Sequence, residues 1–187
     1  MSEYGGSSSS SNYSLDHLHT LLAVNDEAEA ERSGIDLAEV SAALSDAADG
    51  MLEEIERSIY LAALDSRTMA DLFWEEKMER FAAGDPGKLG IRVRVNRGTL
   101  EVAYFRDAFV RNSDSMRKGK TYYAKHIKRS GKHHYNARDF NGAESWEREL
   151  VAAHEKDHAK NRKIFYELSK ARTALKEVKK VIESHRK

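Results

Sequence analysis

Several features that often identify a protein class are missing from this 187-residue chain. It has no cysteine, so neither a disulfide framework nor a zinc site built on thiolates is possible. No apolar run approaches the roughly 20 residues of a membrane-spanning helix, and the first residues lack the basic start and apolar core of a signal peptide. A P-loop, a G-x-S-x-G motif and a dinucleotide fingerprint are also absent. We therefore expect a cytoplasmic protein with no enzymatic activity and no cofactor.

Charged residues are abundant but unevenly distributed. The 31 basic and 31 acidic residues cancel over the whole chain. Residues 1–87, however, contain 5 basic and 19 acidic residues, whereas residues 88–187 contain the other 26 basic and 12 acidic ones. A net charge of −14 therefore precedes a net charge of +14, which indicates that the two halves have different partners or contact each other.

The acidic half has the pattern of helices after a polar tail. Residues 1–14 are rich in glycine and serine, which bury too little apolar surface to fold, so we expect a disordered tail. Residues 15–34 predict one short helix and a break. Apolar residues at steps of three and four over residues 36–83 predict a long acidic helix, with a possible interruption at Asp65-Ser66. The only proline, Pro86, follows its end.

Residues 88–138 are the only part of the chain with a β pattern, and they predict a basic β-meander. The first predicted strand alternates arginine with the apolar residues Ile91, Val93 and Val95. Asn96-Arg97-Gly98 is a plausible hairpin turn. The chain would return over residues 99–106, form a third strand over 121–128 and a short fourth one over 133–135.

A second long helix is predicted over residues 142–185. Asn141 with Glu144 three residues later has the pattern of a capping box, and near-heptad apolar residues follow. Each long helix needs a partner for its apolar stripe. We therefore predict an α+β fold in which the two helices form an antiparallel, coiled-coil-like hairpin with the small antiparallel meander inserted between them. An alternative is that one stripe forms the seam of a homodimer.

The meander carries 14 basic residues against three acidic ones, with aromatic residues and histidines between them. Cationic side chains pair with phosphates and aromatic rings stack on bases, so this composition is typical of a nucleic-acid interface. The alternative is that these cations pair internally with the acidic helix. We expect double-stranded DNA as the partner. The predicted contacts are Arg92, Arg94, Arg97, Arg106, Lys118, Lys120, Lys125, Lys128, Arg129 and Lys132.

Two groups of histidines suggest metal sites, but both have weaknesses. The run His154-Glu155-Lys156-Asp157-His158 matches the H-E-x-x-H motif of zinc peptidases. Its two central residues are charged, and a third ligand is not evident on the same straight helix. The second group, His126, His133 and His134, lies among lysines and arginines that repel a cation. We therefore predict no metal site, and a zinc peptidase is a minor alternative.

A second functional class remains open from the sequence. Long charged helices are also typical of structural or adaptor proteins that bind another protein. Binding of duplex DNA would favour the first hypothesis, and its absence would favour the second.

The order of these segments resembles that of the MobI-type conjugative transfer proteins, small auxiliary factors that act with a relaxase at the origin of transfer. The resemblance covers about residues 88–175. It depends on the alternating basic strand and a few later positions: Tyr104-Phe105, Tyr135, Trp146-Glu147, Glu155, Ala159 and Arg162. It implies recognition of origin DNA and recruitment of the nicking machinery, with no catalysis by this chain.

Overall fold

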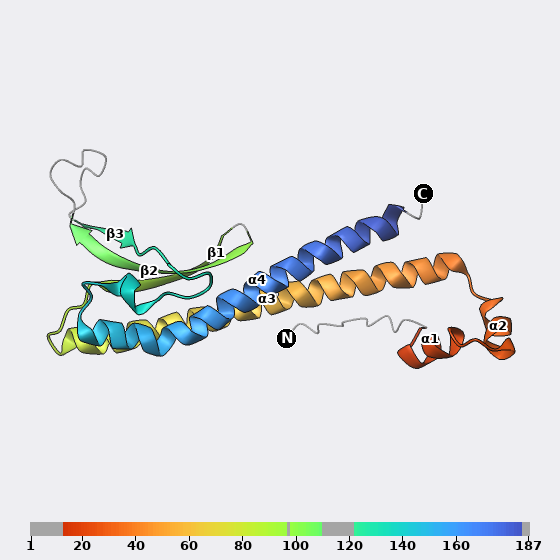
Figure 1. Cartoon of the computed structure of the whole chain (residues 1–187), viewed down its shortest axis with the longest axis horizontal. Helices are drawn as coiled ribbons and strands as arrows, with labels where there is room; N and C mark the ends of the chain where they lie inside the picture. The colour runs from red at the N-terminus through yellow and green to blue at the C-terminus, as the bar shows by residue number, and fades with distance from the viewer. Residues whose placement is uncertain (1–12, 97, 110–121, 185–187) are drawn as a thin grey trace, which may run out of the picture. The chain divides into compact units, whose positions relative to one another are not determined.

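The structure is a computed structural model that describes residues 13–96, 98–109 and 122–184. The chain divides into two compact units. The sheet unit comprises residues 54–173, and the terminal unit comprises residues 1–53 with residues 174–187. The predicted fold class is confirmed, because two long helices flank a three-stranded antiparallel sheet in the chain (Figure 1).

The long helices are α3 (Leu37–Ala82) and α4 (Ser145–Ser184). Polar contacts within the sheet unit join them in antiparallel order: Glu76 to His154, Asp65 to Asn161 and Glu56 to Arg172. The helical hairpin is therefore confirmed. The interruption that we considered at Asp65-Ser66 is wrong, because α3 continues through it and Ser66 is buried. No helix in the described part of the chain is long and apolar enough to cross a membrane.

The start of α4 differs from the predicted capping box. Helix α4 begins at Ser145, and Asn141 instead ends a short 3-10 helix, η2 (Ala137–Phe140). The carboxylate of Glu147 accepts the backbone N–H of Glu144 at 3.1 Å, and its other oxygen accepts the N–H of Leu89 at 2.6 Å. One buried side chain therefore satisfies a free donor at the helix start and also ties it to the first strand.

The sheet consists of β1 (Leu89–Asn96), β2 (Thr99–Phe109) and β3 (Tyr122–His126), in that order. Asn96 pairs with Thr99, so the chain reverses direction between these two residues. Gly98 has a φ of 72°, which a glycine adopts without strain. The predicted fourth strand at 133–135 is wrong, because these residues have no strand structure and lead into η2.

The outer edge of β1 is covered by side chains from α3. Trp74 donates its indole N–H to the carbonyl oxygen of Ile91 at 3.1 Å. Lys77 donates to the carbonyl oxygen of Leu89, and burial lowers the pKa of this lysine despite the nearby acids. Edge strands expose unpaired backbone groups that invite aggregation. These contacts satisfy two carbonyl groups of β1 and fix the sheet against the helix.

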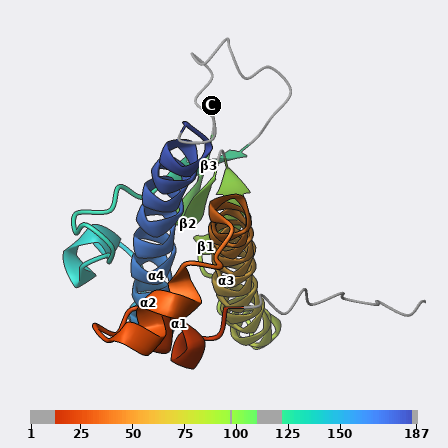
Figure 2. The same cartoon turned by 90° about the vertical axis from the view of Figure 1, so that its right-hand side faces the viewer.

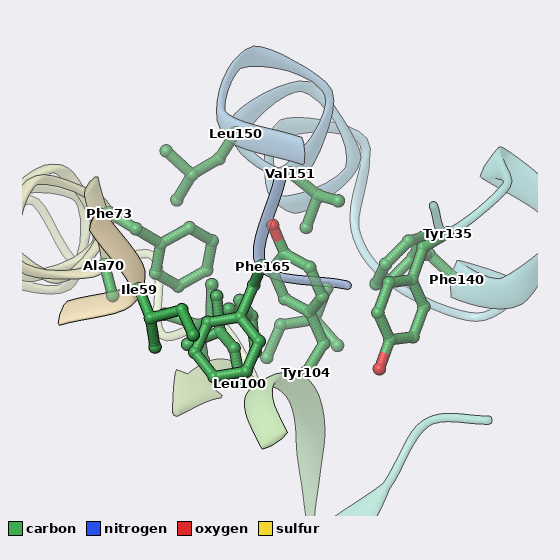
Figure 3. Packing of buried hydrophobic residues seen from close by; sticks show 13 residues of the cluster. Ile59, Ala70, Phe73, Leu100, Tyr104, Tyr135, Phe140, Leu150, Val151 and Phe165 are labelled. Atoms are coloured by element: carbon green, nitrogen blue, oxygen red, sulfur yellow. The ribbon is translucent and has the colours of Figure 1, made fainter. Parts of the chain in front are cut away.

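One apolar cluster holds the sheet unit together (Figure 3). Tyr104 of β2 has no exposed surface, and its ring makes edge contacts with Tyr135 and Phe140, each at 5.2 Å between ring centroids. Edge-to-face packing is favourable for aromatic rings. The cluster also takes Phe73 from α3 and Phe165 from α4. The side of the sheet that carries Tyr104 is therefore covered by this cluster, whereas Arg92 and Arg94 lie on the opposite side.

The terminal unit contains α1 (Leu15–Leu21) and α2 (Asp26–Arg32), where we expected one helix (Figure 2). The side chain of Asn25 accepts the N–H of Ala28 at 2.7 Å and so starts α2. Arg32 then donates to the carbonyl oxygens of Leu21 and Ala23 at 2.5 and 2.8 Å. These bonds tie the end of α1 to α2.

Candidate nucleic-acid interface

The outer face of the sheet carries two of the predicted arginines beside an acid. Arg94 Nε lies 2.6 Å from one oxygen of Glu101, and Arg92 Nη2 lies 3.5 Å from the other. The hydrogen bond from Arg94 is the main reason that the pKa of Glu101 is lowered. Arg92 also lies 3.0 Å from His126 Nε2 on β3. One carboxylate therefore offsets part of the charge of Arg92 and Arg94, whose side chains are 40% and 47% exposed.

Arg106 and Lys125 are paired across β2 and β3, on the side of the sheet opposite to Arg92. Arg106 donates to the carbonyl oxygen of Asn141 at 3.0 Å and so anchors the segment after η2. Lys125 is exposed. Arg106 thus has a structural role, whereas Lys125 extends into solvent from the same side.

The segment after β3 carries the next three predicted residues, Lys128, Arg129 and Lys132. Lys128 and Lys132 are exposed, and Arg129 is half-buried with its Nε donating to the carbonyl oxygen of Gly131. Among the described residues, none of these three side chains forms an ion pair. These three residues therefore form a cationic segment that makes no ion pair in the described part of the chain.

Hydrogen bonds to Asp139 hold this segment in its curved path. Its Oδ2 accepts the N–H of Ser130 at 3.1 Å, the hydroxyl of Ser130 at 2.9 Å and the N–H of Asn136 at 2.9 Å. Burial opposes ionisation of Asp139, but these hydrogen bonds outweigh it and the pKa of the carboxyl group is lowered. The carboxylate is thus used inside the loop.

Helix α4 adds cations that the sequence did not place at the site. Lys132 Nζ lies 4.7 Å from the ring centroid of Tyr166, and Lys170 Nζ lies 5.5 Å from it. His133 packs on the same ring at 5.2 Å between centroids. A pocket of about 250 Å³ opens between the segment and the helix, lined by Arg129, Lys132, Arg162 and Tyr166 among others. We call Lys128, Arg129, Lys132, Lys163, Tyr166 and Lys170 the loop–helix surface.

The electrostatic environment of this surface is positive. The pKa of His133 is lowered, first by burial and then by the charges of Lys132 and Arg129. Lys163 acts on His133 in the same direction. An exposed acid beside this surface, Glu167, lies 3.0 Å from Lys170. The surface therefore keeps an excess of cationic side chains around one exposed aromatic ring.

A buried ion pair lies beneath the surface. Arg162 makes two hydrogen bonds to Glu155, at 2.8 and 2.9 Å, and the two side chains are 3% and 9% exposed. Arg162 also donates to the carbonyl oxygen of His133 at 2.6 Å, and Glu155 accepts the N–H of Tyr135 at 2.7 Å. The pair thus fixes the backbone of the cationic segment from below. Its i, i+7 spacing on one helix is a signal that sequence reasoning did not use.

The H-E-x-x-H run lies on a helix as expected but does not form a peptidase site. Glu155 is engaged with Arg162 and Tyr135. His154 contacts Glu76 at 3.0 Å, while His158 is fully buried beside Tyr104. Within the described ranges, no group of three or more histidines, aspartates and glutamates could hold a metal ion. The arrangement therefore supports a structural role for these residues.

Three predicted contacts, Arg97, Lys118 and Lys120, lie outside the described residues. The structure brings Arg129 and Lys132 together with Lys163, Tyr166 and Lys170 from α4. It places Arg92 and Arg94 on the sheet face and assigns Arg106 to an internal hydrogen bond. The α4 residues recur at i, i+3 and i+7, which is one face of a helix.

Comparison with known proteins adds one family. A family model described as "MobI protein" matches residues 63–176, which is more than half of the chain. No curated protein and no solved structure matches the chain significantly. The matched segment holds the last 20 of the 46 residues of α3, the whole sheet and most of α4. It therefore includes both basic surfaces described above. The chain accordingly belongs to the MobI family, which indicates an accessory role in conjugative mobilisation.

Proposed function

We propose that this chain is a DNA-binding accessory protein that recognises origin-of-transfer DNA and assists recruitment of the relaxase, without catalysing a reaction itself. The observation that carries the proposal is the loop–helix surface, whose Lys128, Arg129 and Lys132 form no ion pair among the described residues. Free cations at a surface gain the most from phosphate contacts, because their binding releases counterions from DNA. The family's role in mobilisation agrees with DNA as the polyanion.

The two basic surfaces contribute unequally in this proposal. The loop–helix surface makes the main phosphate contacts, and Arg92 and Arg94 make weaker ones because Glu101 competes for them. Lys125 adds a further contact, and Arg97, Lys118 and Lys120 stay in the proposed set on their charge alone. Arg106 contributes less than the others, since it already donates to Asn141.

The test is fluorescence anisotropy of the full chain with labelled duplex DNA over a range of salt concentrations. We expect the substitutions Lys128→Ala and Lys132→Ala together to weaken binding and to reduce the slope of log affinity against log salt by about 1.8, the value for two lost phosphate contacts. Arg92→Ala with Arg94→Ala should weaken binding and flatten the slope by less.

A matched control removes the same charge elsewhere. Lys160 and Lys180 are exposed lysines of α4 that lie 2.7 Å from Asp157 and Glu177. Their double alanine variant should keep the wild-type slope. If the control and the Lys128/Lys132 variant flatten the slope equally, the effect is one of net charge and the proposed surface is wrong. Parallel titrations with single-stranded DNA and with RNA measure the preference for duplex DNA.

A further inference from the structure

The terminal unit contains an apolar groove that the proposed DNA contact does not use. It has a volume of about 340 Å³ and is lined mainly by aliphatic side chains of α1 and of the start of α3. Leu22, Val40 and Leu44 line it while remaining 77%, 37% and 53% exposed. Exposed aliphatic side chains around a hollow are typical of a site that a partner covers.

The part of the chain that forms the groove is strongly acidic. Described residues 13–53 contain ten acids and one base, Arg32. That base is engaged with the carbonyl oxygens of Leu21 and Ala23. Exposed Asp36, Glu39 and Asp46 are direct neighbours in sequence of the lining residues Ile35, Val40 and Ala47. An occupant must therefore have an apolar face flanked by positive charge.

Two segments of the chain that could be considered as occupants do not fit the groove. Residues 1–12 are mostly glycine and serine, with one methionine and one tyrosine as large apolar residues, so they are too polar to fill the groove. The basic helix α4 has the right charge, but it already packs on α3, where Lys179 contacts Asp49 within the terminal unit. Two acidic grooves would also repel each other in a symmetric dimer.

We propose that this groove binds a cationic amphipathic helix of another protein. The apolar face of that helix would lie on Leu22, Val40 and Leu44, and its lysines and arginines would pair with the exposed acids of the same unit. Helix-in-groove recognition uses this combination, in which apolar anchors supply affinity and charge selects the partner. The inference does not depend on DNA binding, since the groove and the loop–helix surface share no residue.

The test uses the full chain and three labelled synthetic peptides of about 18 residues, or five helical turns. The first is a leucine–lysine amphipathic helix, the second has the same composition with its leucines scattered, and the third is a leucine–glutamate amphipathic helix. We expect the first peptide to bind, the second to bind at least tenfold more weakly and the third not to bind. Equal binding of the first two would overturn the proposal, because charge attraction alone would then explain it.

Variants locate the contact. Leu44→Ser should weaken binding of the first peptide about tenfold, the effect of removing one buried leucine contact. The matched control is Leu64→Ser, because Leu64 lies on the same helix and is similarly exposed at 61% but does not line the groove. Circular dichroism verifies that both variants fold. Equal affinities of the two variants would overturn the proposal.

Light scattering tests whether a second copy of this chain, instead of another protein, fills the groove. If the wild-type chain is a dimer that Leu44→Ser converts to a monomer, a second copy fills the groove and the proposal is wrong. Duplex DNA binding by Leu44→Ser should equal that of the wild type. If DNA fails to bind any form while the peptide result is as expected, only the proposed function fails.

Discussion

In two regions of the sheet unit, an acidic side chain lies among basic ones. The two acidic side chains differ in how deeply they are buried. On the sheet face, Glu101 lies at the surface, 31% exposed, and takes Arg92 and Arg94 as partners. Under the loop–helix surface, Glu155 is buried and takes Arg162, while exposed Lys132 stays outside the pair. The depth of these two acids decides which cations they pair with: Glu101 pairs with exposed arginines, and Glu155 pairs with the buried Arg162. The exposed acid of the loop–helix surface, Glu167, pairs with Lys170.

This comparison also explains why charge counting misjudges the meander. The predicted contacts look equivalent in the sequence, but their neighbours in space differ. A partly exposed ion pair is worth little in stability, about 0–1 kcal/mol, yet it occupies the cation. A buried pair costs desolvation and is retained where it fixes structure, here the backbone at His133 and Tyr135.

The largest expected effect comes from breaking the buried pair. Arg162→Met leaves the carboxylate of Glu155 buried without its partner and frees the carbonyl oxygen of His133. We expect a loss of about 3–5 kcal/mol in the free energy of unfolding. Denaturant unfolding followed by circular dichroism measures it. The variant should also bind DNA more weakly, because the cationic segment loses its support.

Two controls separate burial from charge. The double variant Glu155→Leu with Arg162→Met removes both charges and should recover much of the lost stability. Arg94→Met removes an arginine from the exposed pair and should change stability by less than about 1 kcal/mol. If Arg94→Met and Arg162→Met were equally destabilising, the burial of an ion pair would not determine its contribution to stability, and the comparison of the two regions would be wrong.

A second effect follows from His158, which lies beside Tyr104 in the same core. Burial, followed by the charges of Arg162 and His154, lowers its pKa to about 4. An unfolded histidine has a pKa near 6.5, so between these values the unfolded chain binds a proton that the folded chain excludes. Stability should therefore fall as the pH drops from 6.5 to 4, by roughly 3 kcal/mol.

The variant His158→Phe isolates this contribution. The ring centroids of His158 and Tyr104 lie 6.4 Å apart. Phenylalanine keeps an aromatic ring at this position but cannot take up a proton. The comparison is between the pH profiles of unfolding for the two proteins, since carboxylates also titrate in this range. If the unfolding free energies of the variant and the wild type depended on pH in the same way, His158 would be hydrated in the folded protein. Water would then reach the core under the loop–helix surface.

The sequence predicted the architecture because periodicity is a local signal. The step of three and four over α3 and the alternation around Ile91 need no knowledge of the rest of the chain. The errors arose where a contact decides the structure. Asn141 has capping chemistry, but Glu147 starts α4 and is also held by Leu89, which is distant in sequence.

The candidate site was predictable only in part for the same reason. The basic composition of residues 88–138 predicted a nucleic-acid contact surface. That Lys132 lies over Tyr166, or that Arg94 has Glu101 as its neighbour, depends on which helix face and which strand register the fold selects. The H-E-x-x-H match illustrates the converse, because Glu155 fits a motif whose chemistry its partner Arg162 precludes.

The smallest effect gives the finest test of the comparison. Glu101→Gln removes the negative charge from the sheet face, keeps the size of the side chain and releases Arg92 and Arg94 for phosphate. We expect duplex DNA to bind about three- to fivefold more tightly, which is the scale of one partly exposed ion pair, and with a steeper salt dependence. Glu177→Gln, which breaks an exposed pair with Lys180 outside both surfaces, is the matched control and should leave the affinity unchanged. A rise in affinity specific to Glu101→Gln would establish that a surface acid restrains these arginines, whereas a fall would mean that Glu101 instead aligns them for DNA. Since the variant changes neither the backbone nor the core, either result bears on the sheet face alone.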